Sequence, residues 1–203
     1  FDNDESCFEA LFSLSDITDT AGLYIDATFK YHAALAQSST NKSSLDVFAR
    51  GTVRVSLGPS TPGRLPSRQL PCSDALPVSP DDFYKSLSDL DYHYSHPFDA
   101  LTGMKRTLGT STGSIKAVEA SDYLVHPAVL DAAFQTVFLA YAAPYDGALW
   151  TMHVPRTIKA VRVNPDICSS ECASNATFPF DTVLPEGTSN VGGDIDIFSN
   201  RGE

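Results

Sequence analysis

The most continuous apolar pattern in the chain covers residues 126–143 and predicts a helix. Apolar side chains recur there at steps of three and four residues, at Val129, Leu130, Ala133, Phe134, Val137, Phe138 and Tyr141. Because most of the circumference of such a helix is apolar, we expect it to be buried among strands. Asp131 and Gln135 interrupt the pattern one turn apart, where the amide can hydrogen-bond to the carboxyl group and orient it.

Residues 1–58 have the pattern of strands. The segments 8–14, 24–33 and 47–57 are rich in aromatic and β-branched side chains and are separated by polar stretches. With no helix between them, they indicate an antiparallel meander. Apolar and polar residues alternate along 47–57, so we expect this strand to have one buried and one solvated face.

A second unit is expected after a linker rich in proline and serine at residues 59–78. The unit, residues 79–203, opens with a helix that should end near Leu90. Ser79 can cap this helix, Pro80 suits its first position, and the two aspartates that follow meet the positive end of its dipole. The remaining strand candidates are the end of 92–108, then 114–118, 158–163, 173–184 and 195–198.

The amino-acid composition limits which binding partners and which cellular compartment the protein can have. The 203-residue chain has a formal net charge of −11, which argues against nucleic acid and anionic membranes as partners. No apolar run approaches the length of a membrane span. Cys168 and Cys172 lack a histidine pair that could complete a metal site, so no metal is expected. The four cysteines have no spacing that demands a bridge, which favours free thiols and a cytoplasmic protein.

The ends of the chain indicate an excerpt from a longer polypeptide. It begins at Phe1 without an initiator methionine or a signal segment, and its last residues resemble a turn.

Asp131 can have a structural or a catalytic role. An acid early in a helix meets the positive end of the helix dipole, a structural role worth about 0.3–1 kcal/mol when exposed. Alternatively, its apolar helical neighbours shield it from water. A shielded carboxyl group keeps its proton more readily, as a general acid requires.

Residues 124–135, Leu-Val-His-Pro-Ala-Val-Leu-Asp-Ala-Ala-Phe-Gln, resemble the His-Pro-x-x-x-Asp-x-x-x-Gln helix of polyketide synthase dehydratase domains, in the form found in fungal highly reducing synthases. Three further segments support the resemblance, in the family's order. Residues 82–98 are similar to its helix and Tyr-x-Tyr-Gly-Pro-x-Phe turn, 154–163 to its Leu-Pro-x-x-Ile strand, and 48–53 to its His-x-x-Gly-x-Val strand.

The resemblance implies an α+β double hotdog fold, in which antiparallel sheets wrap round long central helices. Residues 1–58 would be strands from the end of an incomplete first hotdog unit, and residues 79–203 the second unit. Asp131 would be the catalytic acid, supported by Gln135 and His126. The substrate tunnel would be lined by Tyr94, Phe98 and Pro155.

The reaction implied by the resemblance is dehydration of a β-hydroxyacyl thioester to a trans-enoyl thioester. The substrate would be held on the phosphopantetheine arm of an acyl carrier protein, and the domain itself would bind no cofactor. Other domains of the same synthase, and a second copy in a megasynthase homodimer, would be its partners. Arg156, Lys159 and Arg162 form the only obvious basic cluster for an acidic carrier protein.

The chain also departs from the family pattern. The His-x-x-x-Gly-x-x-x-x-Pro segment that supplies the base is absent, since the histidines at 32, 93, 96, 126 and 153 have other contexts. We therefore expect this base upstream, and expect the excerpt alone to be inactive. Ser95 and His96 replace the Gly-Pro of the turn, and serine adopts left-handed backbone angles less readily than glycine.

Two alternatives remain open. One is a cyclase of the product-template type, which resembles dehydratases but usually has histidine where Gln135 stands. The other is a degenerate dehydratase domain with a structural role in the megasynthase, which the changes at Ser95 and His96 would favour.

Overall fold

The structure is a computed structural model, and it describes residues 7–36, 45–59, 65–68, 74–118, 123–170, 176–187 and 191–199. It divides into two compact units, Phe1–Ser60 and Thr61–Glu203.

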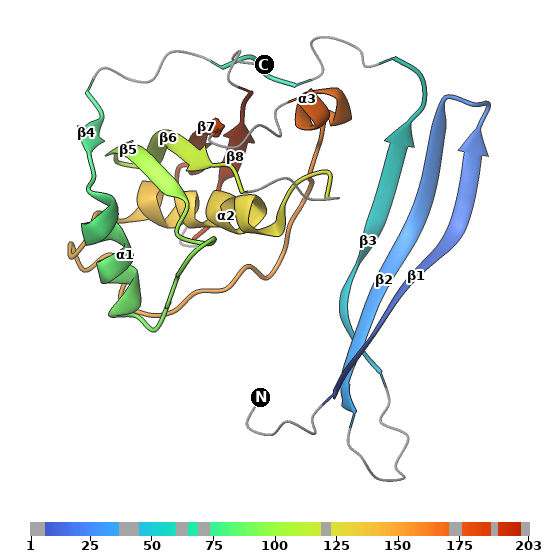
Figure 1. Cartoon of the computed structure of the whole chain (residues 1–203), viewed down its shortest axis with the longest axis horizontal. Coiled ribbons are helices and arrows are strands. Elements are labelled where there is room, and N and C mark those ends of the chain that lie inside the picture. Colours follow the sequence, from blue (N-terminus) through green and yellow to red (C-terminus); the bar gives the residue numbers. More distant parts are fainter. Residues whose placement is uncertain are drawn as a thin grey trace. The chain divides into compact units, whose positions relative to one another are not determined.

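The first unit contains a three-stranded antiparallel sheet in the order β1-β2-β3 (Figure 1). Its strands are β1 (Cys7–Thr20), β2 (Tyr24–Ala36) and β3 (Asp46–Ser56). The predicted meander is therefore confirmed. Strand β1 extends past the predicted segment because a bulge between Ser15 and Thr18 absorbs the polar residues there, with Asp16 at a φ of 52°.

The prediction that β3 has one buried face is wrong. Val53 and Val55, on the face expected to be buried, are 40% and 51% exposed. The described residues of this unit form a single sheet with no second layer packed on that face. Alternation of apolar and polar residues along a strand thus indicates which face is suited to burial. The face becomes buried only where a second layer of helices or strands packs on it.

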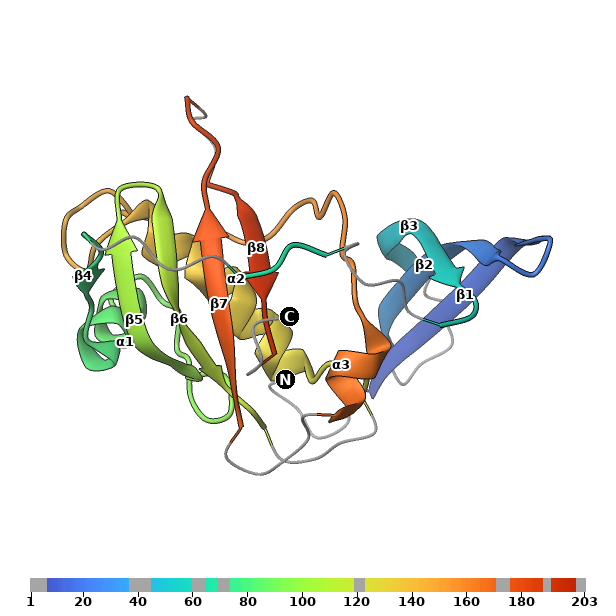
Figure 2. The same cartoon turned by 90° about the horizontal axis from the view of Figure 1, so that it is seen from above.

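The second unit contains a five-stranded antiparallel sheet in the order β4-β5-β6-β7-β8 (Figure 2). The strands are β4 (Leu76–Pro77), β5 (Leu101–Thr107), β6 (Thr110–Lys116), β7 (Thr177–Val183) and β8 (Asp194–Ile197). Helix α1 (Pro80–Ser88) contacts β5, and helix α2 (Pro127–Tyr141) packs against β5 to β8. A short helix, α3 (Pro165–Ser170), was not predicted.

Four of the five remaining strand candidates are confirmed as β5 to β8, but the candidate at 158–163 is wrong. This segment pairs with no strand of the described chain, and Ile158, Val161 and Val163 are 54%, 64% and 40% exposed. Strand propensity mostly reflects packing on a pleated surface, which is missing here. In contrast, Leu76 and Pro77, at the end of the predicted linker, form the edge strand β4, a position that tolerates proline.

Helix α1 begins as predicted. The hydroxyl of Ser79 accepts a hydrogen bond from the Asp82 backbone N–H at 3.5 Å, and Pro80 is the first helical residue. The helix ends at Ser88, two residues before the predicted end. Phe83 and Leu87 are its buried residues and hold it against the sheet.

The core of the second unit lies between α2 and the sheet. Its buried apolar members are Phe83, Leu87, Ala100, Leu101, Met104, Ile115, Val129, Ala132, Ala133, Phe138, Leu139 and Phe180. No helix among the described residues is long and apolar enough to cross a membrane.

A buried polar contact crosses this core. The hydroxyls of Thr136 on α2 and Thr182 on β7 are 2.6 Å apart. Because the Thr136 hydroxyl donates to the Ala133 carbonyl at 2.6 Å, it must accept the proton of Thr182. The Ser111 hydroxyl of β6 donates to the Thr136 carbonyl at 2.9 Å. Each of these three side chains is at most 3% exposed.

Helix α2 is buried against the strands over most of its surface, as predicted, but one face is open. Leu130 is 38% exposed, and Asp131, Phe134 and Tyr141 are half-buried. These residues share the face turned away from the sheet, because positions three, four and seven apart fall on one side of a helix. The apolar pattern correctly predicts the helix but not which part of its circumference the sheet covers.

Candidate active site

Asp131 and Gln135 form the predicted pair on α2. Gln135 Nε2 donates a hydrogen bond of 2.8 Å to Asp131 Oδ2. The Gln135 side chain is fully buried, whereas Asp131 is half-buried, so the apolar neighbours shield Asp131 from water only in part. Gln135 lies at the border between the two faces of the helix and connects the covered face to the open one.

Three groups hold the Gln135 amide in place. Nε2 also donates to the backbone carbonyl of Phe98 at 2.9 Å. Oε1 accepts a hydrogen bond from the Tyr84 hydroxyl at 3.1 Å, and that hydroxyl accepts one from the Leu101 N–H at 3.0 Å. Helix α1 and the strand β5 thus fix the group that orients Asp131.

Tyr84 is the site residue that the sequence did not reveal. It lies within residues 82–98, the helix and turn that resemble the family, and its position on α1 cannot indicate which residue of another helix it meets. Its separation of 51 residues from Gln135 is beyond any local pattern.

An aromatic cluster adjoins this network. The ring of Tyr94 meets Tyr84 edge to face at 6.2 Å and stacks on Tyr92 at 6.0 Å, and Tyr92 contacts Phe138 at 5.2 Å. Burial, followed by the charge of Asp131, raises the pKa of Tyr94 to about 12. Burial likewise raises the pKa of Tyr84 above its ordinary range.

These tyrosines should make the unit sensitive to alkali. A raised pKa means that the folded state favours the neutral phenol. The contribution of Tyr94 to the free energy of unfolding is therefore fully present below pH 10 and is lost as the pH rises toward 12. We expect Tyr94→Phe to lose less stability over this interval than the parent, as measured by near-ultraviolet circular dichroism of the purified protein. The exposed Tyr145→Phe variant should follow the parent curve. Parallel curves for parent and Tyr94→Phe would contradict this expectation.

The other predicted site residues are placed as follows. His126 caps α2, and its Nδ1 accepts a hydrogen bond from the Ala128 N–H at 3.1 Å, in agreement with its predicted position at the helix N-terminus. Phe98 is 40% exposed and reaches the site through its carbonyl. Pro155 is exposed, and no hydrogen bond or ring contact among the described residues connects it to Asp131.

The turn before Phe98 accommodates the departures from the family pattern. The Phe98 N–H donates to the Ser95 carbonyl at 2.7 Å, and the peptide bond between His96 and Pro97 is cis. Ser95 does not have a positive φ. A serine at this position therefore carries no left-handed strain.

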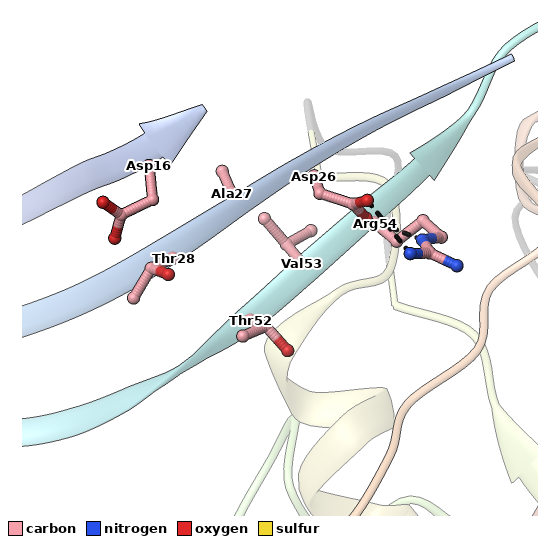
Figure 3. A pocket seen from close by; sticks show the side chains of 7 residues that line it. All are labelled: Asp16, Asp26, Ala27, Thr28, Thr52, Val53 and Arg54. Atoms are coloured by element: carbon pink, nitrogen blue, oxygen red, sulfur yellow. Dashed lines mark hydrogen bonds and ion pairs between the residues drawn. The ribbon is translucent and has the colours of Figure 1, made fainter. Parts of the chain in front are cut away.

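Two pockets lie apart from Asp131. One, of about 320 Å³, is on the first unit, where Asp26 and Arg54 point toward each other and form a bidentate ion pair (Figure 3). The Arg54 guanidinium holds the pKa of Asp26 below its usual range. The other, of about 230 Å³, adjoins the C-terminal end of α2 and is lined by Phe138, Pro144 and Leu149 among others. Neither contains a predicted site residue.

No cluster of three or more histidine, cysteine, aspartate or glutamate side chains suited to a metal ion occurs in the part of the chain that the structure describes. The expectation that the domain binds no metal stays a prediction.

The antiparallel sheet packed on a long central helix defines an α+β hotdog fold, and solved dehydratase structures share it. The chain superposes on the dehydratase structure titled "Structural insights into dehydratase substrate selection for the borrelidin and fluvirucin polyketide synthases" with a TM-score of 0.65 and 19% identity, covering 96% of this chain and 62% of that one. For an inactive mutant of CurK dehydratase the TM-score is 0.66 with 15% identity, covering 97% and 64%. The predicted fold class is confirmed.

The family model described as "Polyketide synthase dehydratase N-terminal domain" matches residues 62–203. Polyketide synthase-nonribosomal peptide synthetase TwmB of Talaromyces wortmannii is 41% identical over 185 residues, and hybrid PKS-NRPS synthetase thnA of Trichoderma harzianum is 34% identical over 207. These alignments cover 91% and 100% of this chain. The chain belongs to the polyketide synthase dehydratase family.

The chain corresponds to a small part of these relatives, since it spans 6% of the length of TwmB and 5% of thnA. The assignment of residues 1–58 and 79–203 to a first and a second hotdog unit stays a prediction.

Proposed function

We propose that this chain carries the acid half of a dehydratase site that converts a β-hydroxyacyl thioester to a trans-enoyl thioester. The observation that supports the proposal best is the pair Asp131 and Gln135. The carboxyl group lies on the open face of α2, where a substrate can reach it, and a buried amide orients it. A positioned, accessible carboxyl group is what general-acid catalysis needs.

In the proposed reaction, a base removes the proton from the α-carbon, and that electron pair forms the new C=C bond. The C–O bond at the β-carbon breaks, and Asp131 donates its proton to the departing hydroxyl, which leaves as water. The base is proposed to be a histidine from another part of the synthase. Among the described residues, Asp131 has no hydrogen bond to a histidine, and the His126 ring faces its own helix terminus.

Two structural neighbours support the choice of an aspartate and a histidine. Two CurK dehydratase structures are of inactive mutants, one with aspartate replaced by asparagine and the other with histidine replaced by phenylalanine. Loss of function at one residue of each type is what an acid and base pair requires.

The substrate is proposed to arrive on the phosphopantetheine arm of an acyl carrier protein of the same synthase. Arg156, Lys159 and Arg162 are exposed on the segment that follows α2 and offer positive charge to an acidic carrier. The reaction needs only proton transfers, so the domain is proposed to bind no cofactor. Homodimerisation is proposed to be a property of the whole synthase.

The experiment that tests the proposal supplies the intact synthase with a β-hydroxyacyl carrier substrate and follows the product by mass spectrometry. We expect loss of one water and an enoyl product with trans geometry. A parallel reaction with a poly-β-keto thioester tests the cyclase alternative. An aromatic product in that reaction would support a cyclase and overturn the proposal. No reaction in either arm would favour a structural, degenerate domain and would overturn the proposal.

A further inference from the structure

We propose that Tyr84 is a positioning residue of this site: it fixes the orientation of the Gln135 amide, so that Asp131 holds its transferable proton on Oδ1. The inference rests on the dehydratase function proposed above. It assigns a task to a side chain on α1 whose hydrogen bonds, among the described residues, go to Gln135 and Leu101 and not to the carboxyl group itself.

The hydrogen bond between Tyr84 and Gln135 has a defined direction. A phenol carries one proton, and the Leu101 N–H already donates to the Tyr84 oxygen at 3.0 Å. The proton of the hydroxyl is therefore free to point at Gln135 Oε1, 3.1 Å away. The backbone of β5 thus makes Tyr84 a donor toward Gln135.

The direction of this hydrogen bond favours one orientation of the Gln135 amide. With Oε1 facing Tyr84, both N–H groups of Nε2 face acceptors, the Phe98 carbonyl at 2.9 Å and Asp131 Oδ2 at 2.8 Å. If the amide were rotated by 180°, Oε1 would face these two acceptors, and both hydrogen bonds from Nε2 would be lost in a fully buried position. Each buried polar group left unpaired costs about 1–3 kcal/mol, so only the observed orientation is populated.

The orientation of the amide distinguishes the two carboxyl oxygens of Asp131. Asp131 Oδ2 accepts the Gln135 N–H and points into the network, whereas Oδ1 has no hydrogen-bond partner among the described residues. The proton of the acid is therefore held on Oδ1, the oxygen left for the substrate. Without the Tyr84 hydroxyl, Oε1 loses the donor that the described residues give it, the amide is held less firmly against Asp131 Oδ2, and the two carboxyl oxygens are distinguished less strictly.

The test compares variants of the intact synthase with the β-hydroxyacyl carrier substrate. Tyr84→Phe should lower kcat about 10- to 100-fold with little change in KM, since the carboxyl group is misoriented while the substrate surface is kept. Tyr92→Phe is the matched control. It also removes a half-buried hydroxyl, but one bonded to the His153 backbone, and should leave kcat unchanged.

A double-mutant cycle separates positioning from a purely structural role. Gln135→Met removes the group through which Tyr84 acts, so Tyr84→Phe should have no further effect on kcat in that background. A structural role would instead lower kcat in both backgrounds. If Tyr84→Phe alone does not fold, the comparison of Gln135→Met with the double variant still decides, and a further fall in kcat would overturn the proposal.

The outcomes also separate this inference from the proposed function. If the parent synthase dehydrates its substrate and Tyr84→Phe keeps the parental kcat, the positioning role fails and the dehydratase function stands. If the parent does not dehydrate, both fail.

Discussion

Asp131→Asn is expected to abolish measurable dehydration while the fold persists. An asparagine has no acidic proton to give to the departing hydroxyl, and loss of a general acid lowers rates by about 10²–10⁴-fold. The amide oxygen can still accept the hydrogen bond from Gln135 Nε2, so the network that orients residue 131 should survive. The measurement is turnover of a β-hydroxyacyl carrier substrate by the intact synthase, together with the melting temperature of each variant.

Asp89→Asn serves as the matched control for this experiment. Asp89 is an exposed carboxylate of the same unit, just after α1, and its loss should leave turnover unchanged. Parental turnover by Asp131→Asn would remove Asp131 from the mechanism. A large fall in melting temperature would instead indicate a structural role.

Phe180→Ala is expected to have the largest effect on stability, a loss of about 3–5 kcal/mol, as is typical when a buried phenylalanine is truncated. Phe180 is fully buried in β7 at the centre of the core. Its ring lies over Gly113 of β6, where a Cβ atom would stand 2.9 Å from the ring. The ring thus fills space that only a glycine leaves free, and its removal should leave a cavity.

Local stability can be measured by amide hydrogen exchange of peptides from β6 and β7 in the intact protein. We expect exchange there to accelerate strongly in Phe180→Ala, because a domain is stable by only about 5–15 kcal/mol. Leu108→Ala, at a position 92% exposed in the same unit, should exchange like the parent. Equal protection in the two variants would show that the core tolerates the cavity.

Local chemistry made much of this structure predictable. The start of α1 depends on Ser79 and Pro80, which act within one turn. The contact between Asp131 and Gln135 depends only on their spacing of four residues in a helix. His126 is a cap because its side chain reaches a backbone N–H two residues away.

The errors arise where distant parts of the chain decide the outcome. Residues 158–163 have the composition of a strand, but pairing depends on a neighbour that the described chain does not place beside them. The exposure of Leu130 depends on which side of α2 the sheet covers. The contact of Tyr84 with Gln135 could not be predicted from the sequence, since it joins α1 to α2 across 51 residues.

The buried contact between Thr136 and Thr182 determines where Asp131 points. Thr136 is five residues after Asp131, about 140° further round the helix. Rotating or sliding α2 by one residue would separate Thr136 from Thr182 and Ser111 and leave hydroxyls unpaired in the core, at about 1–3 kcal/mol each. Apolar side chains alone would allow such shifts, because many of them fit the same surface. Thr136 and Thr182 therefore fix the rotation of α2 about its axis. The direction of the Asp131 carboxyl group on the open face of the helix is set by contacts on the opposite, buried face.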